Sequence, residues 1–275
     1  MGSGVARELI GELGITWRIA QLRVRGQMQY RASFLMQIAG SFIINFVELA
    51  ALLVLFSQFD SLGGWSAGEV VFLYALSAMM FSLGDTVATG LDRFAETMKL
   101  GEFDQMLTRP VSPFLQAMVS DVSLRHVGQM IQGFIVFGYA LTLVDVPWDL
   151  GRVLYLFVVI FCGATLFVCL FAIQAVISFW TVESIEAVNA FTYGGSDLAQ
   201  YPMHIFNRWM QRLFLWVIPV GFVSFLPSLY LLDKPDPLGL PAFARFVAPL
   251  AALGFAVATG LLWGLGVRHY RSTGS

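Results

Sequence analysis

Charged side chains are scarce in this chain of 275 residues. Asp, Glu, Lys and Arg make up 12% of it, whereas soluble domains contain about 25%. Hydrophobic residues make up 57%, and the mean hydropathy is +0.74. A single soluble core of this size could not bury so much apolar surface, so the predicted surrounding is a lipid bilayer. A net charge of −2 without a basic stripe argues against nucleic acid as a partner.

Lysine occurs only at Lys99 and Lys234, and neither follows the glycine pattern of an ATP-binding phosphate loop. The stretch GGSD at 194–197 has paired glycines but lacks the lysine and a preceding strand, so we interpret it as a flexible turn. We therefore predict that this chain binds neither ATP nor another cofactor.

Catalytic and metal-binding patterns are also missing. The histidines are His126, His204 and His269, which we expect near the inner membrane interface, and no two share one helix at ligand spacing. Cys162 and Cys169 would lie about 10 Å apart along a helix, too far for a disulfide. No G-x-S-x-G motif occurs. The sequence thus predicts no metal site and no catalytic residue.

Long apolar runs predict an all-α integral membrane protein with one transmembrane domain over 34–267 and a short cytoplasmic tail at 268–275. Each run can cross a hydrocarbon core of about 30 Å. The six predicted spans are 34–57, 69–91, 127–146, 152–180, 212–231 and 243–267. The fifth contains Pro219 and Pro227, which can kink or break a helix.

The distribution of Lys and Arg predicts the orientation. The predicted inner side comprises the N-terminal segment, the loops at 92–126 and 181–211, and the C-terminus. That side holds thirteen basic residues, whereas the other side holds only Arg152, Lys234 and Arg245. The positive-inside rule therefore places both termini in the cytoplasm.

The segment 1–33 before the first span predicts an amphipathic helix on the inner leaflet. Its apolar residues recur at spacings of three and four, and three arginines lie off that stripe. The apolar stripe is Leu9, Leu13, Trp17, Ala20 and Val24, and the arginines are Arg18, Arg23 and Arg25. A soluble helix or a frayed tail remains the alternative.

Two acids, Glu48 and Asp85, fall inside predicted spans, and Asn45 shares a helix face with Glu48. A carboxylate at membrane depth costs free energy and often marks a transport pathway. The three residues could therefore line a translocation path or bind a proton in an ion-coupled transporter. They could equally serve as hydrogen-bonded links between helices.

The stretch GEFDQMLTRPVSP at 101–113 predicts a short helix held close to the inner face of the membrane. Glu102 and Asp104 favour a helix start, and Pro110 ends the helix. Its predicted apolar face is Phe103, Met106 and Leu107. This face belongs either to an ordinary solvated loop or to a surface that inserts into a groove of a soluble partner.

This stretch, within KLGEFDQMLTRPVSPFLQ, resembles the loop after the second span in bacterial ABC transporter permeases of the type-2 superfamily. The matching residues are Gly101, Glu102, Phe103, Asp104, Leu107, Arg109, Pro110 and Pro113. A second stretch, DLAQYPMHIFNRWMQRLFLWVIPVGFVSFLP, resembles the region around the family's fifth span. It matches at Tyr201, Pro202, Pro219, Phe222 and Pro227.

The resemblance implies a half-transporter in the bacterial inner membrane. Two such permeases, identical or homologous, would pair and bind a dimer of a separate cytosolic ATPase, which would hold ATP and Mg. The stretch after the second span would be the coupling helix that docks on this ATPase. Its contact residues would be Glu102, Phe103, Asp104, Met106, Leu107, Arg109 and Pro110. The resemblance also implies short re-entrant helices over 226–243.

The function implied is an exporter of a small amphipathic or hydrophobic substrate, with ATP hydrolysis on the partner. The alternative is an ion-coupled secondary transporter using Glu48 and Asp85. Such transporters are often built from internal repeats, and we find no convincing repeat in this sequence.

Overall fold

The computed structural model describes residues 31–121, 124–181 and 185–271, and a few isolated positions before residue 31. The predicted amphipathic helix over 1–33 thus lies almost entirely outside the described residues. Within the described part of the chain, the regular elements are helices, apart from one isolated bridge between Leu62 and Trp65. The structure therefore has the predicted all-α architecture.

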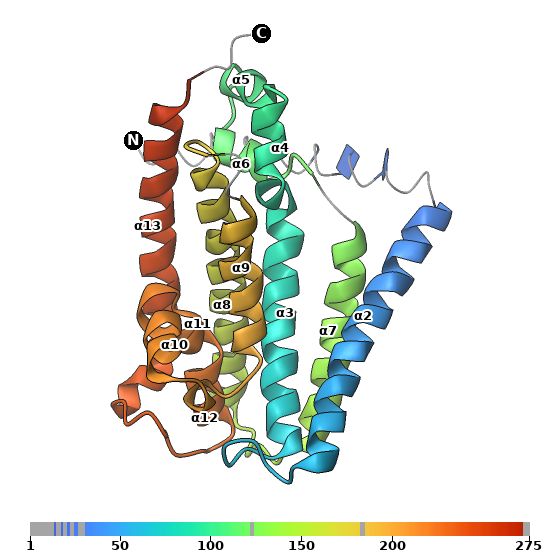
Figure 1. Cartoon of the computed structure of the whole chain (residues 1–275), viewed down its shortest axis with the longest axis vertical. Coiled ribbons are helices and arrows are strands. Elements are labelled where there is room, and N and C mark those ends of the chain that lie inside the picture. Colours follow the sequence, from blue (N-terminus) through green and yellow to red (C-terminus); the bar gives the residue numbers. More distant parts are fainter. Residues whose placement is uncertain are drawn as a thin grey trace.

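In the described part of the chain, five long helices run along the molecule, with a shorter sixth beside them (Figure 1). The long helices are α2 (Arg31–Gln58), α3 (Ala67–Asp92), α7 (Leu124–Leu143), α8 (Leu150–Ile177) and α13 (Ala248–His269), and the shorter one is α9 (Ile185–Ala199).

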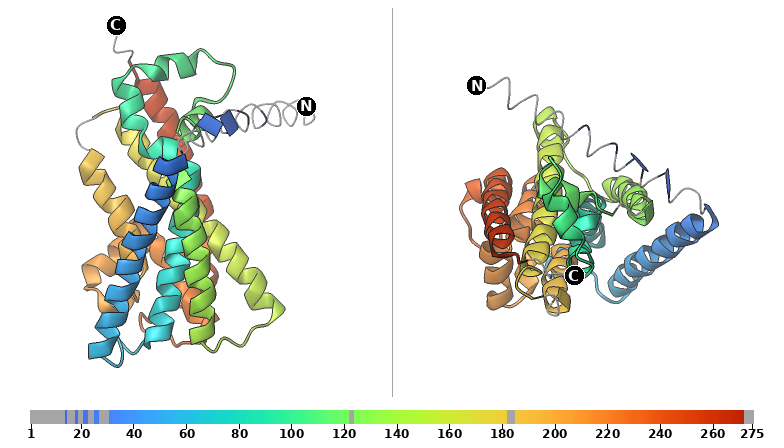
Figure 2. Two further views of the ribbon diagram at one scale, coloured as in Figure 1. Left: turned by 90° about the vertical axis from the view of Figure 1, so that its right-hand side faces the viewer. Right: turned by 90° about the horizontal axis from the view of Figure 1, so that it is seen from above.

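Short helices gather at the two ends of the bundle (Figures 1 and 2). One end, here called the α5 end, carries α4 (Phe94–Lys99), α5 (Glu102–Leu107) and α6 (Pro113–Met118). The opposite end, here called the α12 end, carries η1 (Met203–Ile205), α10 (Arg208–Arg212), η2 (Leu213–Val217), α11 (Val220–Val223), α12 (Phe225–Leu231) and η3 (Ala242–Phe246).

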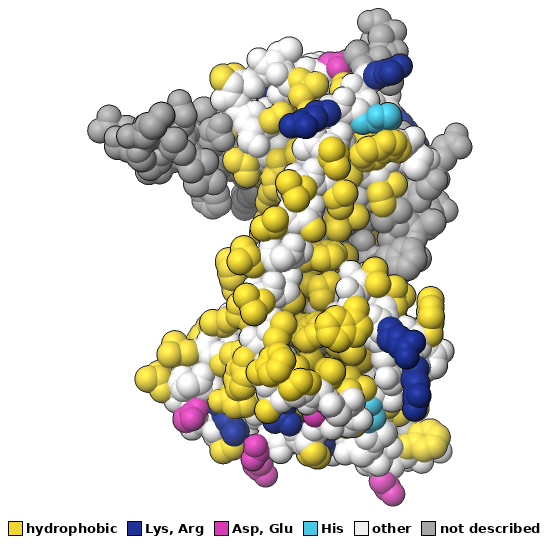
Figure 3. All heavy atoms as spheres, turned by 90° about the vertical axis from the view of Figure 1, so that its left-hand side faces the viewer, with side chains coloured by type: hydrophobic (Ala, Val, Ile, Leu, Met, Phe, Trp, Pro, Cys, Tyr) yellow, Lys and Arg dark blue, Asp and Glu magenta, His cyan; other side chains and the backbone are white. Residues whose placement is uncertain are grey.

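Among the residues that the structure describes, four helices are long and apolar enough to cross a membrane: Leu35–Gln58, Ala67–Lys99, Leu150–Ile177 and Ala248–His269. A bent helix pair over 208–231 makes a fifth span if its two halves are counted as one. The apolar part of α7, Gly128–Leu143, is shorter. Figure 3 shows hydrophobic side chains over the middle of one face, with the charged side chains gathered toward its two ends. This distribution is that of an integral membrane protein.

Helix α3 is the centre of the bundle, because most of its residues are buried and it contacts α2, α7, α8 and α9. Two glycines allow it to approach α8 closely. A Cβ on Gly84 would lie 3.0 Å from the Ala164 carbonyl oxygen, and a Cβ on Gly163 would lie 2.1 Å from the Met80 sulfur. Small residues at a crossing let two helices pack through their backbones, as is common in membranes.

The predicted fifth span, 212–231, is broken rather than continuous, a possibility that its two prolines had indicated. Its two halves, Arg208–Val217 and Val220–Leu231, meet at an angle of 72°. Pro219 lies at the break, where its missing N–H and its ring interrupt the helical hydrogen bonds. The bent pair lies at the α12 end of the bundle (Figure 1).

The segment 181–211 also differs from the prediction, because it contains α9 and leads from one end of the bundle to the other. Ser77 on α3 donates a 2.7 Å hydrogen bond to the Ala199 carbonyl at the end of α9. Beyond it, the His204 ring lies 2.7 Å from the carbonyl oxygen of Gly63, in the loop between α2 and α3. The residues after α9 therefore lie at the α12 end, opposite the segment 92–121.

The position of α9 contradicts three predictions made from the sequence. The stretch GGSD at 194–197 is helical rather than a turn. His204 lies at the α12 end, not with the other two histidines. Arg208 and Arg212 also move to that end, so the Lys and Arg count of thirteen against three becomes eleven against five (13 − 2 and 3 + 2). The excess still favours a cytoplasmic α5 end.

The α12 end is held by Glu69, which makes two kinds of contact. Its carboxylate accepts a 2.7 Å bond from the Ser66 backbone N–H, while the Ser66 hydroxyl accepts from the Glu69 N–H, completing a capping box for α3. Both carboxylate oxygens also lie 2.7 Å from the Lys234 ammonium. Lys234 lies over the ring of the buried Trp65.

We expect Glu69→Ala to lower the free energy of unfolding by about 1 to 3 kcal/mol, since it removes a cap and leaves Lys234 without its ion-pair partner. The measurement is the thermal unfolding midpoint of the purified protein at a fixed heating rate. Glu96→Ala, at an exposed position of α4, is the matched control. Equal midpoints for the two variants would contradict this account of the α12 end.

Candidate functional site

Helices α4, α5 and α6 form a fixed unit at the α5 end. Gly101 begins α5 with a φ of 70°, a left-handed conformation that glycine adopts without strain. Pro113 occupies the first turn of α6, where a missing N–H costs nothing. The Gln116 amide of α6 donates to the carbonyl oxygens of Met106 and Val111, at 2.9 and 2.8 Å. These bonds hold α5 and the following turn against α6.

An aromatic cluster (Phe94, Phe103, Phe179, Trp263 and Tyr270) joins this unit to the long helices. The ring of Phe103 is fully buried, and its centroid lies 4.9 to 5.3 Å from those of Phe94, Phe179 and Tyr270. The edge-to-face geometry of these pairs is the one that aromatic quadrupoles favour. The cluster therefore connects α5 to the end of α8 and to α13.

The predicted outward apolar face of α5 is wrong at two of its three residues. Phe103 is 0% and Met106 8% exposed, because both pack into the protein, whereas Leu107 is 42% exposed. Of the predicted contact residues in this stretch, Glu102, Leu107, Arg109 and Pro110 face outward, and they are here called the α5 surface. Together they form a mixed polar and apolar surface.

Asp104 faces the C-terminal segment rather than solvent alone. Its carboxylate accepts a 3.0 Å hydrogen bond from the Tyr270 hydroxyl, which lies just beyond α13. Burial, and then the Asp104 carboxylate, raises the pKa of Tyr270, so the hydroxyl stays protonated and remains a donor. The bond ties α5 to the end of α13.

Gly90 of α3 packs directly against the end of α6. A Cβ at this position would lie 2.1 Å from the Ala117 carbonyl oxygen and 2.6 Å from the Ser120 hydroxyl. Only glycine therefore allows α3 and the end of α6 to pack at this separation.

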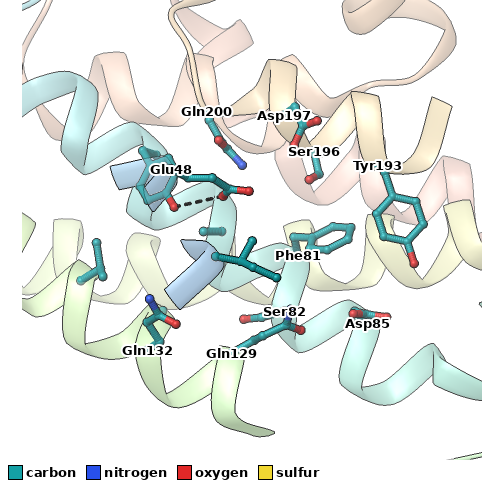
Figure 4. Close-up of a pocket in the computed structure, with 15 residues that line it drawn as sticks. Glu48, Phe81, Ser82, Asp85, Gln129, Gln132, Tyr193, Ser196, Asp197 and Gln200 are labelled. Atoms are coloured by element: carbon teal, nitrogen blue, oxygen red, sulfur yellow. Dashed lines mark hydrogen bonds between the residues drawn. The ribbon is translucent and has the colours of Figure 1, made fainter. Parts of the chain in front are cut away.

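A polar cavity of about 210 Å³ lies between α2, α3, α7 and α9 (Figure 4). Three carboxylates from three helices line it: Glu48 of α2, Asp85 of α3 and Asp197 of α9. The remaining lining residues are Ile44, Tyr74, Ala78, Phe81, Ser82, Gln129, Gln132, Gly133, Val136, Tyr193, Ser196 and Gln200. The cavity thus combines acidic, amide, hydroxyl and aromatic groups in the middle of the bundle.

The acidic side chains differ in their surroundings. Glu48 is exposed, and its carboxylate accepts a 3.4 Å hydrogen bond from the Tyr74 hydroxyl. Asp85 is 3% exposed, and its Oδ2 lies 3.0 Å from His126 Nδ1. The same histidine nitrogen lies 3.3 Å from the Thr89 hydroxyl. The second carboxylate oxygen of Asp85, Oδ1, has no hydrogen-bond partner among the described residues.

Of the residues that the sequence suggested for a translocation path, Glu48 and Asp85 both line this cavity. The side chain of Asn45 lies outside the described residues. Asp197 was missed, because the stretch GGSD was interpreted as a turn. Its acidic character beside two glycines was visible in the sequence, but the helix that carries it was not.

Comparison with protein families matches residues 42–274 to the ABC-2 family transporter protein. This chain belongs to the ABC-2 transporter family. No curated protein and no solved structure matches this chain significantly. The protein is therefore a transport permease, the membrane component of an ABC transporter and not itself catalytic. Permeases of this family generally work with an ATPase partner and form dimers.

For this permease, we expect Phe103→Ala to lower the free energy of unfolding by about 3 to 5 kcal/mol, because it empties the middle of the aromatic cluster. Leu107→Ala, four residues along the same short helix, should change it by less than about 0.5 kcal/mol. Thermal unfolding of both variants checks the prediction. A larger loss for Leu107→Ala than for Phe103→Ala would contradict the observed orientation of α5.

Proposed function

We propose that this permease is the membrane half of an ATP-driven exporter, which moves a small amphipathic or hydrophobic molecule across the bacterial inner membrane. The observation that carries the proposal is the fixed α4–α6 unit at the end of a chain that belongs to the ABC-2 family. A segment that receives force from a partner must be rigid, and its bonds to Gln116 and its buried ring of Phe103 supply that rigidity.

The partner would be a dimer of a cytosolic ATPase, which binds ATP and Mg, and it would dock on the α5 surface. Leu107 supplies the apolar contact, while Glu102 and Arg109 supply charges of both signs around it. An apolar centre with a charged margin is the usual composition of a protein interface. Phe103 and Met106 then act from within, as packing residues of α5.

Movement of the docked α5 would reach the membrane helices through the aromatic cluster. Phe103 touches Phe179, which follows α8, and Tyr270, which follows α13, so a displacement of α5 moves both helix ends. Packed aromatic side chains are close to incompressible and transmit such displacements. Gly90 adds a direct contact between α6 and α3.

The translocation path would begin at the polar cavity, which α3 connects to the α5 end. A second permease, identical or homologous, would complete the path. The exposed apolar residues of α2, among them Leu35, Met36, Ile43 and Phe46, are available to lipid or to this second permease. The segment 226–243 at the α12 end, for which the resemblance implies short re-entrant helices, would close the outer mouth.

Leu107→Ser in the α5 surface tests the proposal. We expect at least about a tenfold loss of affinity for the partner ATPase, because full burial of a leucine side chain contributes about 1.5 to 3 kcal/mol and about 1.4 kcal/mol is a factor of ten. The measurement is co-purification in detergent from cells that express both proteins, together with the dissociation constant of the complex. Leu150→Ser, at an exposed position of the α12 end, is the control.

Normal assembly and transport by the Leu107→Ser variant would defeat the docking role. Transport that depends on the proton gradient instead of ATP would contradict the whole proposal. If transport survives ATP depletion but stops when the proton gradient is dissipated, the protein is an ion-coupled transporter, and the buried pair of Asp85 and His126 becomes the proton site to examine.

A further inference from the structure

We propose that the polar cavity binds the positively charged head group of an amphipathic organic cation, such as a protonated or quaternary amine. This proposal rests on the proposed export function, because it names the class of substrate. It also makes a prediction about binding alone, which can be tested without the ATPase.

The first observation is the charge of the cavity. Glu48, Asp85 and Asp197 reach it from three helices, and none of its described lining residues is a lysine or an arginine. The basic group that faces an acid there is His126, which pairs with Asp85. Acids placed inside a membrane protein without basic partners are costly unless a cation compensates them. A cationic ligand would supply the missing compensation for Glu48 and Asp197.

The second observation is an unused acceptor. Asp85 is 3% exposed and lines the cavity, yet its Oδ1 atom has no hydrogen-bond partner among the described residues. Figure 4 shows Asp85 at the edge of the cavity, to the right of Ser82 and below Tyr193. A buried acceptor left without a partner costs about 1 to 3 kcal/mol, and a charged one costs more. A ligand with an N–H donor or a positive charge would remove that cost.

The third observation is the aromatic wall. Tyr74, Phe81 and Tyr193 line the same cavity, and the rings of Phe81 and Tyr193 pack edge to face at 5.6 Å. The faces of such rings attract cations, and aromatic walls are a common means of binding quaternary ammonium groups. A neutral or anionic head group would gain nothing from this combination of rings and carboxylates.

Size and geometry narrow the class of cation. A volume of about 210 Å³ is smaller than the usual range of about 300 to 1,000 Å³ for drug-sized ligands, so the cavity suits a head group rather than a whole molecule. In the described part of the chain, no three His, Cys, Asp or Glu side chains converge closely enough to hold a metal ion. Glu48 is exposed while Asp85 is buried, so the cavity opens toward α2, where an apolar tail could lie.

The test measures binding of radiolabelled benzyltrimethylammonium to the full-length permease in lipid nanodiscs, without the ATPase. This probe keeps its charge at any pH. Its neutral isostere, neopentylbenzene, and the anion benzylsulfonate serve as competitors. We expect saturable binding that the unlabelled cation displaces and that the two other compounds, at equal concentration, do not.

The decisive variant combines Glu48→Gln with Asp197→Asn, which preserves shape and removes two charges. We expect its affinity for the cation to fall at least about tenfold. Asp60→Asn, in the exposed loop between α2 and α3, is the control and should bind as the unchanged protein does. Asp85→Asn is a further test, but it also disturbs the pair with His126, so its unfolding midpoint is measured alongside.

Equal displacement by the neutral isostere, or unchanged affinity of the double variant with a normal unfolding midpoint, would overturn the proposal. So would stronger displacement by manganese or calcium ions than by the organic cation. Each of these outcomes would leave ATPase docking untouched, because the ATPase is absent from the assay. Conversely, cation binding by a permease that never associates with an ATPase would refute only the proposed export function.

Discussion

The close packing of α3 against its neighbours is the constraint on which the rest of the structure depends. A Cβ at Gly84, Gly90 or Gly163 would clash with the neighbouring helix. Because glycine has no side chain at these positions, α3 can pack closely against α8 and α6. The same buried helix carries Glu69 at the α12 end, Asp85 beside the cavity and Gly90 beneath α6. A shift of α3 therefore changes both ends of the bundle and the cavity between them. This continuity supports the proposal that movement at the α5 end reaches the cavity.

Polar contacts between helices are the second feature of the interior. The side-chain amide of Gln174 on α8 donates to the Asp92 carboxylate of α3 at 3.0 Å. The Thr192 hydroxyl of α9 donates to the side-chain oxygen Oε1 of Gln174 at 3.4 Å. In a bilayer such groups must find partners inside the protein, so they fix which helices are neighbours. At the cavity one such group lacks a hydrogen bond, because the Oδ1 atom of Asp85 has no partner among the described residues. This acceptor lies where the proposed substrate would bind.

Hydropathy predicted the helices α2, α3, α7, α8 and α13, because long apolar runs have few other stable conformations in lipid. It missed α9, whose fifteen residues include Asn189, Asp197 and two adjacent glycines. Contacts with α3 and α8 bury part of this polar helix, and hydropathy cannot report such burial. Periodicity likewise placed Phe103, Met106 and Leu107 together near one face of α5, but it could not tell that Phe103 and Met106 turn toward the protein. Two of the aromatic partners of Phe103, Phe179 and Tyr270, follow α8 and α13 and lie far away in the sequence.

The central claim is that the α5 surface and the residues after α9 lie on opposite sides of the membrane. Single cysteines at Leu107, Arg208 and Asp60, in a chain with Cys162 and Cys169 replaced by alanine, test it with a membrane-impermeant thiol reagent. The structure predicts that the cysteines at 208 and 60 react from the outside of intact cells, and that the cysteine at 107 reacts only in inverted membrane vesicles. Reaction of 208 together with 107, and not with 60, would contradict the account.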